Sequence, residues 1–428
     1  STGMARWLGL DIGKGAVRLA LLHSSYRSCV VEALREERIA DHETQSAALR
    51  AAVAGLRFDA VATVLGGERA FVRRIHLPAA AHKRLNDVLS FEVEATLPFE
   101  PDDAVMDHRL LTFVKGVDEE GQIPIFSGVA YTEEVRDRIG LVLRGTGQEP
   151  QRVGVGPLPL ANLCSVAREL DRPEPICLLE LGEDETGVVV LRQGEPRLAR
   201  SLSRGVRNLP AEADALGREL RQTLAAWRMQ EGTPIEALYT VGVGHDLGGL
   251  HAFLGHHLGI PVASLPPLSL GTEVIGLEAS FPRYARAIGL ALGLWRKPVD
   301  LNLRQGPLEA QQSYQFLREK TPLLAGLAAA IFVSFGFAIF AEMRSLDAER
   351  GLLEQQLGLA TESQLGEKTS DPKRATDLLE DVISGKTGDP IPKMDAFDVM
   401  VEISERIPPE VVHDIADFDY NRGDVKIA

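Results

Sequence analysis

The chain has 428 residues, and its 61 acidic and 46 basic side chains give a formal net charge of −15. Nucleic-acid binding needs basic stripes, so this balance argues against a DNA or RNA partner and suits solubility or a basic protein partner. The three cysteines, Cys29, Cys164 and Cys177, show no Cys-x-x-Cys spacing, which argues against a disulfide framework or zinc site and suits a reducing compartment.

The N-terminal residues predict a strand, a tight turn and a second strand. Trp7–Leu10 is a β-type run, Asp11–Gly15 reads Asp-Ile-Gly-Lys-Gly, and Ala16–Leu22 is again strand-like. Glycines in such a turn allow backbone N–H groups to approach a phosphate. Strand signals alternate with helical stretches from Arg6 to about Leu294, so the predicted class is α/β.

The same pattern returns later in the chain. Cys177–Gly182 and Gly187–Leu191 predict a second strand, turn and strand. Leu238–Gly244 predicts a strand that ends in Gly-Val-Gly, and a helix is predicted over Leu247–Leu258. In this order the three elements resemble the actin/Hsp70/sugar-kinase superfamily.

A narrower resemblance is to the actin-like cytoplasmic proteins of type IV pilus and type II secretion machines. It is carried by Phe91–Glu100 with the following Asp107, and by the helix and strand predicted between Ala130 and Leu160. Leu301–Gly306 is similar to the Asn-Leu-Leu-Gln-Gly motif of GspL-type inner-membrane proteins of type II secretion systems.

This resemblance implies an actin-like (ASKHA) cytoplasmic domain over residues 4–300. In the pilus system, the actin-like protein PilM and the membrane protein PilN are separate chains joined through a similar Asn-Leu-Leu-Pro peptide. Here the two parts are continuous.

In a nucleotide site of the superfamily type, Asp11 would position a Mg²⁺-bound water and the Gly13–Gly15 backbone would cradle phosphates, with Lys14 adding charge. The second hairpin has Glu180 where the superfamily has Asp, and Glu183–Glu185 makes its turn acidic. One carboxylate about 4 Å from a phosphate oxygen costs roughly 4 kcal/mol at an effective dielectric near 20, about a thousandfold in affinity.

The third element keeps Gly242 and Gly244, but Val243 stands where the family prefers glycine. We therefore expect a vestigial nucleotide site and no bound cofactor, with a working Mg-ATP site as the alternative. The residues of this cofactor-binding site are Asp11, Gly13, Lys14, Gly15, Gly182, Gly242 and Gly244.

The sequence shows no pattern of residues that is typical of a catalytic or metal-binding site. His245, His251, His256 and His257 are spaced by six, five and one residues, whereas metal-binding helices place His pairs at i and i+4. No Gly-x-Ser-x-Gly turn occurs, and no cysteine has an activating context. We expect no catalytic residue, no metal and no enzyme activity.

Candidate partner-binding residues come from the two stretches that carry the narrower resemblance. Within the family, the first stretch is an insertion that contacts partners, although Glu92 and Glu94 also read as a solvated helix face. The candidates are Glu92, Glu94, Pro98, Phe99, Asn302 and Leu303.

Residues 321–341 form an uncharged run between Lys320 and Glu342. As a helix this run spans roughly 31 Å, close to the ~30 Å hydrocarbon core of a bilayer. We expect a single transmembrane helix here, preceded by a juxtamembrane linker over 301–320. A buried core helix is the alternative.

The orientation follows from three signs. The N-terminus lacks a secretory signal, the cysteines suit a reducing compartment, and three basic residues precede the helix while two follow it. These residues are Arg304, Arg318 and Lys320 before the helix, and Arg344 and Arg350 after it. We expect a single-pass protein of a bacterial inner membrane, with its N-terminus cytoplasmic and its C-terminus periplasmic.

The tail predicts three parts. Residues 342–360 form a helix with coiled-coil spacing, and residues 361–393 form a polar linker. Over 394–428, a helix at Ala396–Arg406 precedes strands at Val411–Phe418 and Asp424–Ala428, with a turn at Asn421–Gly423. This order resembles the start of a ferredoxin-like α+β periplasmic domain, and we expect the natural chain to continue.

Together these features predict an inner-membrane scaffold of a type II secretion system. It would recruit the secretion ATPase, a GspE-like protein, pair with a GspM-like bitopic protein, and form a homodimer. The alternatives are a nucleotide-dependent actin-like switch and the equivalent component of a type IV pilus platform. The sequence does not identify the ATPase-docking face or the copy number.

Overall fold

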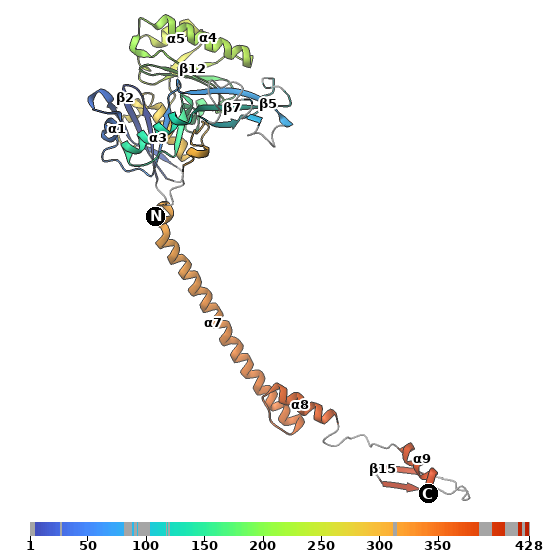
Figure 1. Ribbon diagram of the computed structural model, residues 1–428. Coiled ribbons are helices and arrows are strands. Elements are labelled where there is room, and N and C mark those ends of the chain that lie inside the picture. Colours follow the sequence, from blue (N-terminus) through green and yellow to red (C-terminus); the bar gives the residue numbers. More distant parts are fainter. Residues whose placement is uncertain are drawn as a thin grey trace. The chain divides into compact units, whose positions relative to one another are not determined.

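The computed structural model describes residues 5–25, 28–80, 88–89, 92, 103–116, 118, 120–310, 315–384, 396–406, 418–421 and 424–427. It divides into two units, Ser1–Ser313 and Tyr314–Ala428 (Figure 1). Glu94, Pro98 and Phe99, three of the predicted partner-binding residues, lie outside the described residues.

The first sheet of unit 1 begins with the predicted hairpin. Its strands run in the order β14-β3-β2-β1-β4-β8, with β1, β2 and β3 antiparallel and β4 and β8 parallel to β1. The bounds are β1 Ala5–Ile12, β2 Ala16–Ser24, β3 Cys29–Arg38, β4 Ala60–Leu65, β8 Arg152–Val155 and β14 Gly271–Thr272. Helices α1 (Gln45–Val53) and α3 (Thr132–Thr146) lie side by side (Figure 1).

The second sheet repeats this topology in the order β11-β10-β9-β12-β13. Its first three strands form antiparallel pairs, and β12 and β13 add in parallel. The bounds are β9 Ile176–Leu181, β10 Thr186–Arg192, β11 Glu195–Leu202, β12 Ala237–Val241 and β13 Val262–Ser264, with helices α4 Ala213–Glu231 and α5 Leu250–Leu258. Two halves with one strand order confirm the predicted actin-like fold.

Between β4 and α3 the chain forms a smaller antiparallel sheet, in the order β5-β7-β6. The bounds are β5 Ala70–Pro78, β6 Ala104–Leu110 and β7 Gln122–Tyr131. The predicted insertion, which begins at Phe91, lies between β5 and β6, and Glu92 is exposed there.

Helix α6 (Ala285–Trp295) packs closely against the first sheet because small residues face it. On β1, Leu8 and Leu10 pack towards α1, and the alternation of a strand turns Gly9 towards α6. A Cβ atom at Gly9 would lie 1.9 Å from the carbonyl oxygen of Ala287. A Cβ at Gly289 would lie 2.1 Å from the carbonyl oxygen of Pro159. These glycines therefore fix the position of α6.

Unit 1 continues beyond residue 300, where the sequence predicted a linker. Leu301 and Leu303 are fully buried in its core. The Leu303 N–H donates to the carbonyl oxygen of Val153 at 2.8 Å, so this segment pairs with the edge strand β8. The unpaired backbone of an edge strand explains the pairing, and it moves the domain boundary past Leu308.

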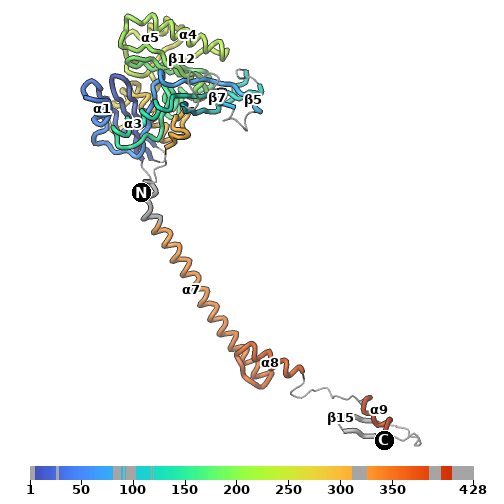
Figure 2. Tube along the Cα trace, in the orientation of Figure 1, coloured from blue at the N-terminus to red at the C-terminus, as the bar shows by residue number. Residues whose placement is uncertain are grey.

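Unit 2 begins with the long helix α7, Gln315–Leu365, which contains the predicted spanning run (Figure 2). The stretch from Ala325 is long and apolar enough to cross a membrane, and the structure buries none of its most apolar 18 residues. Phe332 and Phe337, for example, expose 77% and 72% of their surface. Such exposure is costly in water and favourable in lipid.

The predicted polar linker over 361–393 is partly helical, which corrects that expectation. Helix α7 continues to Leu365, and α8 runs over Pro372–Ile383. Proline is favoured at the first position of a helix, and the Asp371 side chain accepts a hydrogen bond from the Lys373 N–H. A helix therefore begins at Pro372, inside the predicted linker.

The C-terminal elements match the predicted order. Helix α9 spans Ala396–Arg406. Strands β15 (Phe418–Asn421) and β16 (Asp424–Ile427) pair antiparallel, with Phe418 opposite Ile427. The ferredoxin-like assignment stays a prediction, because most of the strand predicted from Val411 lies outside the described residues.

Candidate functional site

The three glycine-rich turns meet at one cleft between the halves of unit 1. Asp11 is the last residue but one of β1, and the turn after the strand closes with the Gly13 N–H donating to Ala16 O at 3.0 Å. Gly182 makes the matching bond to Glu185 O after β9. Gly242, whose φ is +88°, places its N–H within 2.8 Å of Pro282 O. The chain thus positions the elements of a phosphate site.

The predicted site residues lie around this cleft with one exception. Asp11, Gly13, Lys14, Gly15, Gly182 and Gly242 line it, together with Val243. Gly244 does not line the cleft, and a Cβ there would lie 2.3 Å from the Val206 side chain. Gly244 is therefore a packing position.

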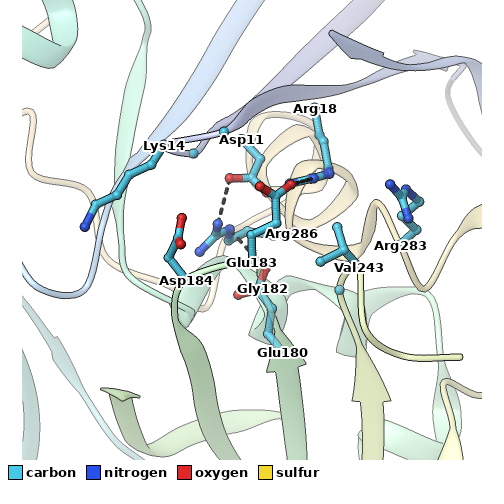
Figure 3. A pocket seen from close by; sticks show the side chains of 13 residues that line it. Asp11, Lys14, Arg18, Glu180, Gly182, Glu183, Asp184, Val243, Arg283 and Arg286 are labelled. Atoms are coloured by element: carbon cyan, nitrogen blue, oxygen red, sulfur yellow. Dashed lines mark hydrogen bonds and ion pairs between the residues drawn. The ribbon is translucent and has the colours of Figure 1, made fainter. Parts of the chain in front are cut away.

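The centre of the cleft holds a guanidinium group that the sequence reading missed. Arg286, near the start of α6, has only 11% of its side chain exposed. Its Nη2 lies 2.8 Å from Asp11 Oδ1 and its Nε 3.1 Å from Glu180 Oε1 (Figure 3). Its Nη1 lies 3.2 Å from Glu185 Oε1. One side chain thus joins both phosphate-type hairpins, the first through Asp11 and the second through Glu180 and Glu185.

A second layer of arginines neutralises the rest of the acidic turn. Arg18 on β2 places Nη2 2.5 Å from Glu183 Oε1 and Nε 3.0 Å from Glu36 Oε2. Arg207 contacts Asp184 at 2.9 Å. A Cβ at Gly15 would lie 2.3 Å from Glu183 Oε2. The Glu183 carboxylate therefore covers the turn where a phosphate would be cradled.

Lys14, which we expected to add charge to the site, is turned away from the cleft centre (Figure 3). Its Nζ lies 3.1 Å from Glu68 Oε1, in an exposed ion pair. The positive charge inside the cleft comes from arginines instead.

Mg-nucleotide does not fit this arrangement. The cleft has a volume of about 60 Å³, whereas small-molecule sites have about 300–1,000 Å³. The Arg286 guanidinium takes the place beside Asp11 where the superfamily holds Mg²⁺-bound water, and a second cation there would meet like charge. The residues present form a closed ion-pair cluster between the two halves.

Burial sets the proton affinities of this cluster. Burial raises the pKa of Glu180 to about 7, the Asp11 and Glu185 carboxylates add to this, and Arg286 opposes it. Burial by itself lowers the pKa of Arg286, but the Asp11, Glu180 and Glu185 carboxylates outweigh it and raise that pKa well above its ordinary value. Arg286 therefore stays charged at every accessible pH.

The predicted partner-binding residues Asn302 and Leu303 contact their own domain, which corrects the expectation that another chain uses them. The Asn302 side-chain oxygen accepts from Val153 N–H at 3.0 Å, and the Asn302 N–H donates to Asp107 Oδ2 at 2.7 Å. Leu303 is fully buried. The Asn-Leu segment thus binds beside β8 of its own chain.

The clustered histidines have separate partners. His251 Nε2 lies 2.8 Å from Thr240 Oγ1, His245 Nδ1 lies 2.9 Å from Gly242 O, and His257 packs against the Phe253 ring. Among the described residues, no group of three or more His, Cys, Asp or Glu side chains is placed to hold a metal ion.

No model of a known protein family and no curated protein matches the chain. Among solved structures, it is similar to a chain of the PilM-PilN type IV pilus biogenesis complex, with 26% identity and a TM-score of 0.57 over 67% of this chain and 98% of that one. It also resembles the cytoplasmic domain of EpsL, an inner-membrane component of the Vibrio cholerae type II secretion system, with 14% identity and a TM-score of 0.41, over 71% and 100%.

A Bacteroides thetaiotaomicron protein with an actin-like ATPase fold is more distant, with 10% identity and a TM-score of 0.38 over 60% of this chain and 90% of that one. The likeness to the pilus complex carries the argument. It confirms the resemblance to the actin-like proteins of pilus machines.

Replacing Arg286 by Ala tests the cluster. The change leaves the Asp11, Glu180 and Glu185 carboxylates without their shared cation, so we expect a loss of about 3–5 kcal/mol in the free energy of unfolding at pH 8. Arg283→Ala, which removes a more exposed arginine just before α6, should cost about 1 kcal/mol or less. Urea unfolding of both variants measures this, and equal losses would contradict it.

The raised pKa of Glu180 gives a pH dependence with a definite sign. Below its unfolded pKa of about 4.5 the carboxyl group is protonated in both states, so its contribution to stability is fully present. As the pH rises, the unfolded state loses the proton first, and the contribution is lost progressively through the folded pKa of about 7. Relative to Glu180→Gln, the unmodified protein should lose stability between pH 4.5 and 7 in denaturant titrations. A gain in the stability of the unmodified protein, relative to Glu180→Gln, over the same pH range would refute this.

Proposed function

We propose that the protein is a membrane-anchored assembly component of a type II secretion or type IV pilus machine. Its actin-like domain lies in the cytoplasm and docks the ATPase of the machine. Helix α7 crosses the inner membrane, and the C-terminal elements contact partners on the far side, among them a bitopic protein and a second copy of this chain.

The likeness to the PilM-PilN complex is the observation that carries this proposal. The alignment covers 98% of the matched chain, so it extends over a whole assembly protein. The Asn-Leu segment of this chain binds beside β8 through Asn302 and Leu303. In this chain the segment leads directly into α7, which ties the docking domain to its anchor covalently.

The closed cleft supports docking over catalysis. An actin-like domain that works by nucleotide turnover needs room for Mg-nucleotide between its halves. Here that space is taken by Arg286 and the carboxylates around it. The domain is therefore a rigid surface for partners, and we propose that it is not an enzyme. This disfavours the second candidate, a nucleotide-dependent switch.

Two observations bear on which of the two machines the protein serves. One likeness, with a TM-score of 0.57, is to the pilus complex. The continuity of actin-like domain and spanning helix is the feature that the sequence shares with GspL-type proteins. The proposed role, a membrane platform for an ATPase, is the same in the secretion and the pilus machine.

Capture of the ATPase tests the role. The full chain in detergent, bearing an affinity tag, should retain the secretion or pilus ATPase of the same organism. A chain reduced to residues 315–428 should not retain it, because the docking domain is then missing. Retention by the short chain, or by neither chain, would count against the proposed role of unit 1.

A further inference from the structure

A second hollow lies next to the closed cleft. It opens at the carboxyl ends of the parallel strands β1 and β4, and it has a volume of about 420 Å³. Ligands of open α/β sheets bind beyond the carboxyl ends of adjacent strands, and this volume suits a small ligand. Among the lining residues, the hollow shares only Gly13 and Lys14 with the cleft.

The hollow carries more positive than negative side chains, although the whole chain is acidic. Two of its cations are already paired in exposed ion pairs. Lys14 Nζ lies 3.1 Å from Glu68 Oε1, and Arg69 Nη1 lies 2.5 Å from Glu134 Oε2. Exposed pairs of this kind contribute little to stability, about 0–1 kcal/mol. They can therefore rearrange around an incoming anion.

The two remaining cations, both on α3, have no carboxylate within ion-pair distance among the described residues. Arg138 is partly buried and donates from Nη1 to Ile12 O at 3.2 Å. Arg144 is exposed and makes no hydrogen bond to a described residue. They lie six residues apart on one helix, about 1.7 turns, and Asp137 adds an exposed negative charge to the lining.

Arg138 is the group with most to gain from an anion. Burial, together with the Arg69 and Arg286 guanidinium groups, lowers its pKa to about 10, although the Asp11 and Glu134 carboxylates oppose this shift. A partly buried cation without a carboxylate at ion-pair distance costs free energy, and a phosphate offers a guanidinium two parallel hydrogen bonds. A ligand bearing phosphate would supply the missing partner.

We propose that this hollow binds a small phosphorylated ligand, with the Arg138 guanidinium as its main anchor and Arg144 as a second contact. The site is separate from the sealed cleft, and it places a ligand against the first hairpin. It would give the docking domain a regulatory input without nucleotide turnover.

Calorimetry on the full chain in detergent tests this proposal, with pyrophosphate as the probe in low-salt buffer. We expect saturable binding that Arg138→Gln weakens by about tenfold or more, because a charge-assisted hydrogen bond is lost. Arg144→Gln should weaken it severalfold, and this exposed residue can be replaced without disturbing the fold. Arg136→Gln is the matched control, because Arg136 is exposed on the same helix outside the hollow.

Parallel titrations with ADP and glycerol phosphate separate the sources of the phosphate. Tighter binding of ADP that depends on Arg138 identifies a nucleotide, and equal binding of all three probes identifies a general phosphate site. Thermal melts of each variant report folding. No saturable binding to the unmodified chain would overturn the proposal. So would binding that Arg138→Gln and Arg144→Gln leave unchanged, or that Arg136→Gln weakens equally.

Discussion

The shared ion pair of Arg286 with Asp11, Glu180 and Glu185 is the interaction on which the domain depends. It joins the two halves of the actin-like fold at the point where related folds hold Mg-nucleotide. The guanidinium lies near the N-terminus of a helix, where the dipole disfavours a cation. The surrounding carboxylates offset this unfavourable interaction. Its position follows from close packing of α6 against Gly9, where a side chain would collide with the helix backbone.

This constraint changes how the fold can work. A cleft that opens and closes around nucleotide makes an actin-like domain a switch, whereas a cleft closed by its own side chains makes it a fixed surface. The pairing of Asn302 and Leu303 with β8 acts in the same direction, because it holds these two residues against the core of their own domain. Both features suit a domain that presents partners to a membrane anchor.

The sequence predicted the parts that depend on local pattern. The Asp11–Gly15 turn, the helix over Ala396–Arg406 and the uncharged run of α7 were all readable from spacing and composition. Arg286 was not, because its partner Asp11 is 275 residues away in the chain. The three acidic residues after Gly182 could have indicated it, because carboxylates that come together in a cleft require cations beside them. The hydrogen bond between Val153 and Asn302 was also not predictable from local pattern, because the two residues are far apart in the chain.

Titration of Mg-ATP into the full chain and into Asp11→Asn tests most directly whether the cleft is closed. Asn keeps the shape of Asp11 and removes its charge, so a Mg-nucleotide bound between the halves would lose its contact there. The account predicts the same isotherm for both proteins, because no nucleotide enters the cleft. A micromolar affinity in the unmodified chain that Asp11→Asn abolishes would contradict it.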